Sequence, residues 1–321
     1  METYLGVDVG SVTTKLALLN QSHELVASIY IRTQGNPVNM IKEGLEEIRK
    51  QMSPEAEICG VGTTGSGRYL AAVMLGGDLV KNEITAHAIA AMEYVPDVQT
   101  IFEIGGQDSK IIIVRGNVVV DFGMNSVCAA GTGSFLDHQA ERLNIRIEDF
   151  GDHALRSENP ARIAGRCTVF AESDMIHKQQ MGYPTDDIVY GLCQSMVRNY
   201  LNNVALGKEI RPKMIFQGGV AFNKGIVRAF TETFKTEVYV PPHNELMGAI
   251  GVAILVHEEM KANHHPTKFK GFGVSQMDYK TSSFICKACP NLCEISQISV
   301  DGRVLARWGG RCDMWERIEN K

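Results

Sequence analysis

The chain has 321 residues, 44% of them hydrophobic, which is enough for a globular core and for two domains. Its formal net charge of −5, without a run of Lys or Arg, argues against nucleic-acid binding. The N-terminus lacks the pattern of a signal peptide, and the longest apolar run, 246–256, is too short to cross a bilayer. We therefore expect a cytoplasmic protein without membrane contact. In that compartment, eight cysteines indicate metal or redox chemistry more than disulfides.

The first predicted element is an apolar strand at 4–9 that contains Asp8 and runs into a Gly-Ser-Thr turn. A second strand, 16–19, returns after the turn. The hydroxyls and backbone N–H groups of such a turn form a cradle for phosphate, and an acid just before it can hold Mg²⁺ through water. The candidate phosphate ligands are Gly10, Ser11, Val12, Thr13, Thr14 and Lys15.

The same pattern recurs about 95 residues later, around Glu103. In each copy a glycine follows the acid by two positions and a lysine follows it by seven, so that Gly105 and Lys110 correspond to Gly10 and Lys15. An ordinary glycine hairpin explains either copy alone. Two copies in register predict two related lobes with a nucleotide in the cleft between them.

The second turn is assigned the same role as the first. Its candidate phosphate ligands are Gly105, Gly106 and Gln107. Either Gln107 or Asp108 would orient the attacking water, because positioning is most of the work in phosphoryl transfer. Between the two copies, the polar loop 62–68 fits a ligand contact and a surface turn equally well. His87, on an alanine-rich helix, is interpreted as a core or interface residue.

Cys128 and Cys167 each stand at the entrance of a predicted helix, because apolar residues recur at helical spacing after Gly133 and after Cys167. The N-terminus of a helix carries partial positive charge, which favours the thiolate that ligates metal. A four-iron cluster takes four thiolates, so a twofold dimer would complete the set. The alternative is two buried structural thiols. Gly131 and Gly133 favour the cluster, since they let the backbone approach a bulky ligand closely.

The next predicted helix begins near Thr185 and ends at Gly207, and Cys193 lies on its apolar face as a core residue. A buried strand from Met214 then enters a Gly-Gly turn, which can close against a base or ribose. The candidate adenosine contacts are Gln217, Gly218, Gly219, Pro242 and His243.

The polar, proline-bearing stretch after residue 260 predicts a linker, 261–280, followed by a cysteine-rich tail, 281–321. The tail has the spacing Cys-x2-Cys-x3-Cys-x18-Cys. Such a set fits an iron–sulfur cluster and structural zinc, and the absence of histidine does not decide between them. The candidate ligands are Cys286, Cys289, Cys293 and Cys312.

The segments Cys128-Ala-Ala-Gly-Thr-Gly-Ser-Phe-Leu and Cys167-Thr-Val-Phe-Ala-Glu-Ser-Asp resemble the two cluster-binding segments of the 2-hydroxyacyl-CoA dehydratase activators. These are ATP-driven activases related to the benzoyl-CoA reductase ATPase subunits, and the resemblance covers about residues 4–256. The two phosphate turns and the adenosine turn together resemble the superfamily of acetate and sugar kinases, heat-shock ATPases and actin. The resemblance implies an α/β, actin-like ATPase fold in 1–260, with two ribonuclease H-like lobes and cluster-binding helices near 128–180.

As cofactors, the resemblance implies ATP, Mg²⁺ and a [4Fe–4S] cluster that Cys128 and Cys167 bind between the subunits of a homodimer. As partners, it implies an iron–sulfur dehydratase or reductase that accepts the electron, and a ferredoxin- or flavodoxin-type electron source. The family usually has Asp where this chain has Glu103, which puts that metal contact in question. The tail resembles a cysteine segment of larger, multidomain relatives, whereas most short activases end near residue 256.

Two other functions fit parts of the pattern. A small-molecule kinase on the same fold would share the nucleotide motifs, but it would need an acceptor pocket and a base, for which the sequence gives no indication. A chaperone-like or scaffold ATPase with structural zinc would be colourless and stable in oxygen. ATP turnover without a phosphorylated product would separate the activase from the kinase.

Overall fold

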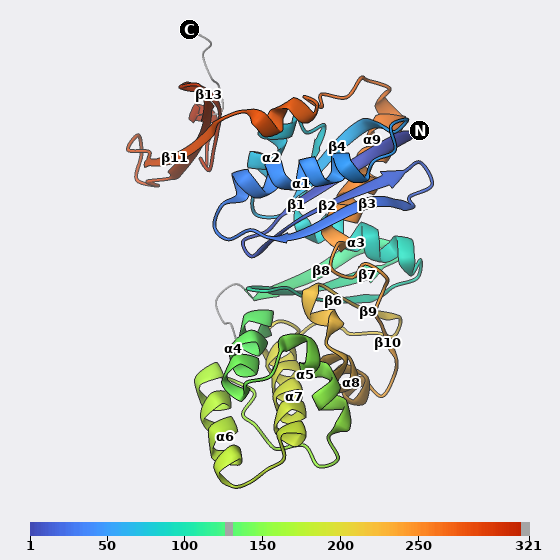
Figure 1. Ribbon diagram of the computed structural model, residues 1–321, viewed down its shortest axis with the longest axis vertical. Helices are drawn as coiled ribbons and strands as arrows, with labels where there is room; N and C mark the ends of the chain where they lie inside the picture. The colour runs from blue at the N-terminus through green and yellow to red at the C-terminus, as the bar shows by residue number, and fades with distance from the viewer. Residues whose placement is uncertain (126–130, 316–321) are drawn as a thin grey trace. The chain divides into compact units, whose positions relative to one another are not determined.

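The computed structural model describes residues 1–125 and 131–315, which form two compact units (Figure 1). The first lobe comprises Met1–Ala86 and the chain from Gly248 onward, and the second lobe is His87–Met247. The two boundaries fall inside helix α3 (Glu83–Tyr94) and at the start of helix α9 (Met247–Asn263). The chain therefore enters and leaves the second lobe through helical connections.

The first lobe is built on a five-stranded sheet of order β3-β2-β1-β4-β5, antiparallel from β3 to β1 and parallel from β1 to β5. The strands are β1 (Glu2–Val9), β2 (Thr13–Asn20), β3 (Leu25–Arg32), β4 (Glu57–Thr64) and β5 (Leu79–Val80). Leu5 and Val7 pack with helices α1 (Pro37–Gln51) and α2 (Arg68–Leu75), and the alternate residue Gly6 faces α9. A Cβ at Gly6 would lie 1.9 Å from the Ala249 carbonyl oxygen, so only glycine lets α9 pack this closely.

The second lobe repeats this topology, which confirms the predicted duplication. Its sheet order is β10-β9-β6-β7-β8, and from the β8 edge it is again three antiparallel strands followed by two parallel ones. The strands are β6 (Thr100–Ile104), β7 (Ser109–Arg115), β8 (Val118–Asn125), β9 (Met214–Gln217) and β10 (Val238–Tyr239).

Helices α4 to α8 gather on one face of the second sheet (Figure 1). They are α4 (Gly133–Leu143), α5 (Ile147–Arg156), α6 (Thr168–Gln180), α7 (Thr185–Asn203) and α8 (Lys224–Phe234), with the short 3-10 helix η2 (Gly219–Phe222). Helix α7 is the centre of this layer and ends four residues before the predicted Gly207. No helix among the described residues is long and apolar enough to cross a membrane.

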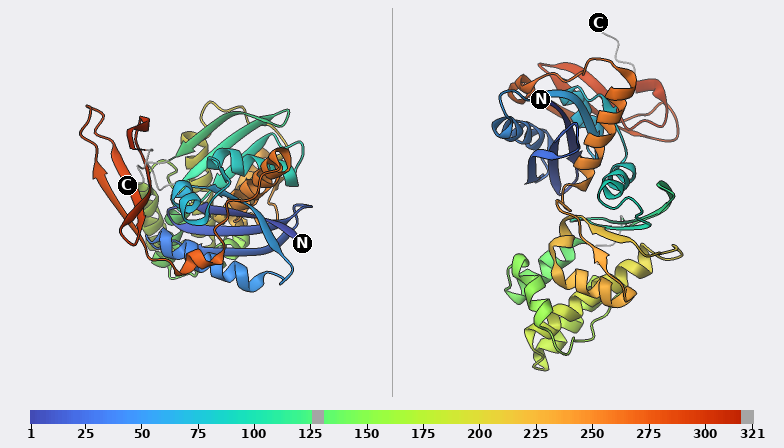
Figure 2. Two further views of the ribbon diagram at one scale, coloured as in Figure 1. Left: turned by 90° about the horizontal axis from the view of Figure 1, so that it is seen from above. Right: turned by 90° about the vertical axis from the view of Figure 1, so that its right-hand side faces the viewer.

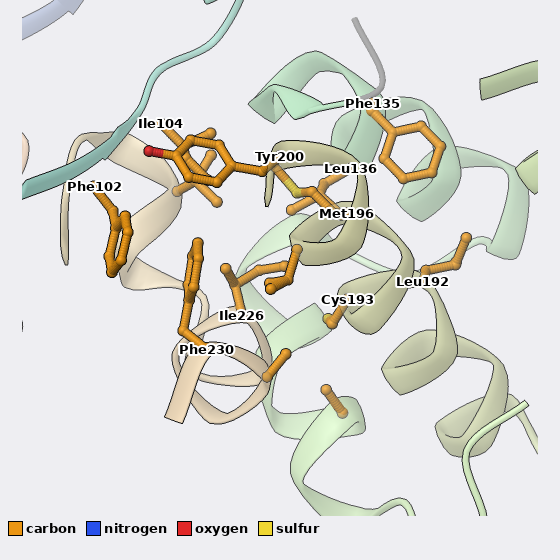
Figure 3. Packing of buried hydrophobic residues seen from close by; sticks show 14 of the residues in the cluster. Phe102, Ile104, Phe135, Leu136, Leu192, Cys193, Met196, Tyr200, Ile226 and Phe230 are labelled. Carbon is orange, nitrogen blue, oxygen red and sulfur yellow. The ribbon is translucent and has the colours of Figure 1, made fainter. Parts of the chain in front are cut away.

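The core between this sheet and these helices is aromatic (Figure 3). The ring of Phe102 stacks on Phe230 at 4.9 Å between centroids and meets Tyr200 edge-on at 5.9 Å. Cys193 projects from α7 into this core and is fully buried, as predicted. Burial raises the pKa of its thiol, so Cys193 is an inert core residue.

The C-terminal residues form a three-stranded antiparallel sheet of order β11-β12-β13 (red strands in Figure 2). The elements after α9 are η3 (Phe272–Gln276), β11 (Tyr279–Ile285), β12 (Glu294–Val300), β13 (Arg303–Trp308) and η4 (Asp313–Trp315). Tyr279 and Ile298 from this sheet are buried in the same apolar cluster as Leu45 of α1 and Met74 of α2. The tail therefore packs on the first lobe.

Candidate functional site

The first phosphate turn connects β1 to β2 in the first lobe. The Gly10 N–H donates to the Thr13 carbonyl at 2.9 Å and closes the turn. Asp8 and Lys15 are register partners on the two strands, and Lys15 Nζ lies 3.0 Å from Asp8 Oδ2. Asp8 is only 4% exposed, whereas Ser11 at the tip is exposed. The predicted acid and lysine thus meet beneath an accessible turn.

Thr14 supports the turn from inside. Its hydroxyl is buried and bonds with the Thr33 hydroxyl at 3.0 Å. Thr33 in turn donates its side-chain hydroxyl to the Gly10 carbonyl at 3.0 Å and its N–H to the Val12 carbonyl at 2.7 Å. Sequence reasoning grouped Thr14 with the phosphate ligands and missed Thr33, which braces the turn.

The stretch 62–68, predicted as a polar loop, comprises the end of β4, the turn 65–67 and the first residue of α2, and it packs against the end of β1 that carries Asp8. A Cβ at Gly65, where φ is +85°, would lie 2.5 Å from Asp8 Oδ1, and the Gly67 N–H donates to the Val9 carbonyl at 2.8 Å. The neighbouring hydroxyl of Thr64 is buried and has no hydrogen-bond partner in 1–125 and 131–315, and Thr64 is paired in register with Asp8. This threonine belongs to the stretch 62–68, for which sequence reasoning left a ligand contact and a surface turn open.

The second phosphate turn has the same construction in the second lobe. The Gly105 N–H donates to the Asp108 carbonyl at 2.9 Å. Lys110 pairs in register with Glu103, and Lys110 Nζ lies 3.0 Å from Glu103 Oε2 and 2.7 Å from Asp108 Oδ2. The Lys110 side chain is 2% exposed, whereas Gln107 at the tip is exposed. The two turns therefore share three features: the register of their strands, the hydrogen bond that closes the turn, and the ion pair between the acid and the lysine.

The adenosine turn that follows β9 packs against Glu103. Gly218 has φ of +91°, and a Cβ there would lie 2.4 Å from the Ile104 carbonyl oxygen and 2.9 Å from Glu103 Oε1. Asn244 clamps the turn, because its carbonyl accepts the Gly218 N–H at 2.8 Å and its Nδ2 donates to the Gly218 carbonyl at 2.9 Å. The structure thus brings Gly218 and Glu103 together within one lobe.

The other predicted adenosine contacts differ in accessibility. Gln217 is fully buried, and its Nε2 lies 2.8 Å from His87 Nδ1, so His87 is a buried partner of this strand end, as its interpretation as a core residue expected. Pro242 and His243 are exposed, and the His243 carbonyl accepts the Leu246 N–H at 2.8 Å. Of this set, Gln217 supports the turn and the exposed pair remains accessible to a ligand.

Of the two cysteines predicted to share a cluster, Cys128 lies outside the described residues and Cys167 is the N-cap of α6. The Cys167 thiol is partly exposed, and its carbonyl accepts the Ala171 N–H at 3.0 Å. Val169 and Phe170, in the first turn of α6, are 67% and 66% exposed. Cys167 therefore stands at a helix N-terminus next to an exposed apolar surface.

The loop before Cys167 is held by α7. Asn199 Nδ2 donates to the Arg166 carbonyl at 3.0 Å, and the Ser195 hydroxyl donates to the Ala164 carbonyl. The next residue on α7, Tyr200, donates its hydroxyl to the Lys110 carbonyl at 2.6 Å. Burial and the charge of Glu103 raise the Tyr200 pKa well above its usual value, so this hydroxyl keeps its proton. Consecutive residues of one helix thus hold the Cys167 loop and the strand that follows the second phosphate turn.

Asn199 also approaches the other cysteine segment. It is 1% exposed, and its Oδ1 would lie 3.1 Å from a Cβ at Gly131, three residues after Cys128. Within the described chain this Oδ1 accepts no hydrogen bond. Sequence reasoning missed Asn199, for which the signal was an amide in the apolar interior of α7.

The four tail cysteines flank the same end of the three-stranded sheet. Cys286 follows β11, Cys293 precedes β12 and Cys312 lies shortly after β13, and the Cys286 N–H donates to the Cys293 carbonyl at 2.8 Å. The indole of Trp315, followed by the Ala288 N–H, lowers the pKa of the Cys286 thiol. No three His, Cys, Asp or Glu side chains of the described residues converge as a ready metal site, so the tail metal stays a prediction.

Comparison with known proteins places these features in a family. Residues 5–256 match the model of the BadF/BadG/BcrA/BcrD ATPase family. The chain belongs to this family. The match spans both phosphate turns, the Cys167 helix and the adenosine turn, and it ends before the tail.

The most informative relatives of this family member are dehydratase activators. The chain is 32% identical to the 2-hydroxyisocaproyl-CoA dehydratase activator of Clostridioides difficile, over 82% of this chain and 98% of the relative. It is 33% identical to the (R)-2-hydroxyglutaryl-CoA dehydratase activating ATPase of Acidaminococcus fermentans, over 79% and 97%. The structure of the Clostridium difficile activator with bound ADPNP matches with a TM-score of 0.74, at 32% identity, over 82% of this chain and 97% of the other.

A more distant structure supports the fold alone. A ROK family glucokinase from Streptomyces griseus matches with a TM-score of 0.52 at 12% identity, over 80% of this chain and 99% of the other. The predicted actin-like ATPase fold and the resemblance to the activators are therefore confirmed.

Proposed function

We propose that this family member is an ATP-hydrolysing electron donor that activates an iron–sulfur partner, such as a 2-hydroxyacyl-CoA dehydratase or a related double-cluster protein. The observation that carries the proposal is on α7, where Asn199 holds the Cys167 loop and Tyr200 holds the strand after the second phosphate turn. A kinase needs no such link between a phosphate turn and a thiol at a helix N-terminus. The similarity to the two dehydratase activators described above supports the same class of partner.

Each turn would bind phosphate through N–H groups other than those of Gly10 and Gly105, which close the turns. Asp8 and Glu103 would hold Mg²⁺, which would offset the negative charge of the phosphates. Asp108 is engaged by Lys110 at 2.7 Å, while Gln107 is exposed at the tip of its turn. This difference favours Gln107 as the residue that orients the attacking water.

Cys128 and Cys167 would hold a [4Fe–4S] cluster together with the same pair of a second subunit, in a cytoplasmic homodimer. Among the described residues, Cys167 suits such a cluster, because its thiol is partly exposed and lies at the N-terminus of a 13-residue helix. When bound, the cluster would supply a low-potential electron, received from a ferredoxin- or flavodoxin-type protein. The exposed Val169 and Phe170 would form part of the surface around it.

Anaerobic purification with counts of iron, sulfide and zinc tests this proposal first. About two irons per chain would support one shared cluster, and about six would add a second cluster in each tail. About two irons with one zinc would make the tail a structural zinc site. A protein that cannot be loaded with iron would refute the electron-donor function.

The phosphate assignment is tested separately by Lys15→Ala. We expect ATPase activity to fall by more than tenfold, because the lysine lies beneath the first turn. Lys50→Ala, on the exposed end of α1, is the matched control and should leave activity unchanged. Unchanged ATPase activity in Lys15→Ala would show that the turn does not bind phosphate.

A further inference from the structure

The N-terminus of α4 is hydrogen-bonded to the second phosphate turn. The Gly133 N–H donates to the Gly105 carbonyl at 2.8 Å, and the Ser134 N–H donates to the Gly106 carbonyl at 2.8 Å. The Ser134 hydroxyl donates to the same Gly106 carbonyl at 2.5 Å. The first N–H groups of a helix have no partner within the helix, and here the Thr132 side chain does not cap them. The phosphate turn therefore serves as the cap of α4.

The close packing at this contact leaves little room for the phosphate turn or the start of α4 to move independently of the other. A Cβ at Gly133 would lie 3.0 Å from the Gly105 carbonyl oxygen, 3.2 Å from Val220 Cγ2 and 3.4 Å from the Gly106 Cα. A displacement of the turn by about an ångström would stretch these hydrogen bonds beyond their normal range or move the helix end with it.

The first lobe provides an internal comparison, because its phosphate turn has the same construction. There the Gly10 carbonyl accepts from the Thr33 hydroxyl at 3.0 Å, and the following helix, α1, is capped by its own Asn36 side chain, which accepts the Asn39 N–H at 3.2 Å. Among the described residues, the start of α4 is hydrogen-bonded to carbonyls of the second phosphate turn itself, those of Gly105 and Gly106. In the first lobe the corresponding contact, from the Gly67 N–H before α2, goes instead to the Val9 carbonyl, one residue ahead of the turn. The α4 contact therefore differs between the two lobes.

Peptide geometry makes the contact sensitive to what the turn binds. A peptide unit is planar and trans, so its C=O and N–H point in opposite directions. The carbonyls of Gly105 and Gly106 point to α4, and the N–H groups of the same units, on Gly106 and Gln107, point away from it. One peptide unit can therefore face a phosphate on one side and Ser134 on the other.

We propose that Ser134 is a positioning residue that transmits the nucleotide state of the second phosphate turn to the start of α4. The inference rests on the proposed function, since the turn must bind the phosphates of ATP. The Ser134 hydroxyl fixes the orientation of the Gly106 peptide unit, and a change of that unit on loss of the terminal phosphate moves the start of α4.

Hydrogen exchange on the full-length protein tests the inference without requiring the loaded cluster. Amide exchange is measured by mass spectrometry for peptides from 101–115 and 131–143, without nucleotide, with ADP and with a non-hydrolysable ATP analogue. In the wild type, the difference between ADP and the analogue appears in both peptides. In Ser134→Ala it persists in 101–115 and falls by about fivefold to tenfold in 131–143, as expected for the loss of one short hydrogen bond. Ser134→Thr, which keeps the hydroxyl, restores it.

The control is Ser173→Ala, because the Ser173 hydroxyl also donates to a backbone carbonyl, that of Val169 at 2.9 Å, but does so within the other cysteine helix. It should leave the nucleotide response of 131–143 unchanged. A normal response in Ser134→Ala would overturn the inference, as would a wild type that hydrolyses ATP without any response in 131–143. The latter result needs no variant, so it stands even if Ser134→Ala folds poorly. A wild type that binds no nucleotide at all would instead refute the proposed function, and the inference with it.

Discussion

The buried ion pair beneath the second phosphate turn predicts a large effect of Lys110→Ala on stability. Lys110 is 2% exposed and its ammonium faces two carboxylates, one of which, Glu103, has a side chain only 6% exposed. Removal of one member of a buried pair costs about 3–5 kcal/mol, because the remaining charge stays in a site of low polarity. For a lobe of this size the loss corresponds to a melting temperature lower by about 10 °C.

The duplication supplies the matched control, Lys15→Ala. Its lysine side chain is 17% exposed, so water can partly replace the ammonium beside Asp8, and we expect a loss of about 1–3 kcal/mol. Both variants are compared with the wild type by calorimetry. Glu103→Met combined with Lys110→Met should recover most of the lost stability, since it removes both buried charges. A smaller loss for Lys110→Ala than for Lys15→Ala, or no recovery in the double variant, would refute the reasoning.

Two further predictions concern a turn and a histidine. Gly218→Ala should cost about 2–4 kcal/mol of unfolding free energy in urea, because its Cβ meets the Ile104 carbonyl oxygen and its φ is positive, whereas Gly182→Ala, with positive φ and no neighbour within 4 Å, should cost about 1 kcal/mol. Equal costs would contradict this account. Burial, followed by the charge of His23, lowers the pKa of His257 below 6.5. The unfolded chain therefore binds that proton more readily, so stability should fall as pH falls below about 6.5, with a smaller slope in His257→Gln. An unchanged slope would exclude His257 as the cause.

Sequence reasoning succeeded where the signal was local. The offsets from Asp8 to Lys15 and from Glu103 to Lys110 are the same in both copies, so the duplication could be predicted. The ion pairs that these residues form were not predicted, because Lys15 was assigned to phosphate. The burial of Cys193 followed in the same way from helical spacing on α7.

It could not predict contacts that depend on register between distant segments. Thr33 braces the first turn across a strand pair, and His87 meets Gln217 from 130 residues away. The role of Asn199 depends on where α7 crosses the Cys167 loop. Such contacts follow from tertiary packing, which no periodicity of a single segment encodes.

The packing of the tail on α1 and α2 changes what the tail can be. Its buried Tyr279 donates a hydrogen bond to the Met74 carbonyl at 3.3 Å, and Ile298 fills the same apolar cluster. If the tail detached from the first lobe, apolar surface would be exposed on both the tail and the lobe, because the tail supplies core residues. The tail is thus an integral part of the first lobe rather than an appended module.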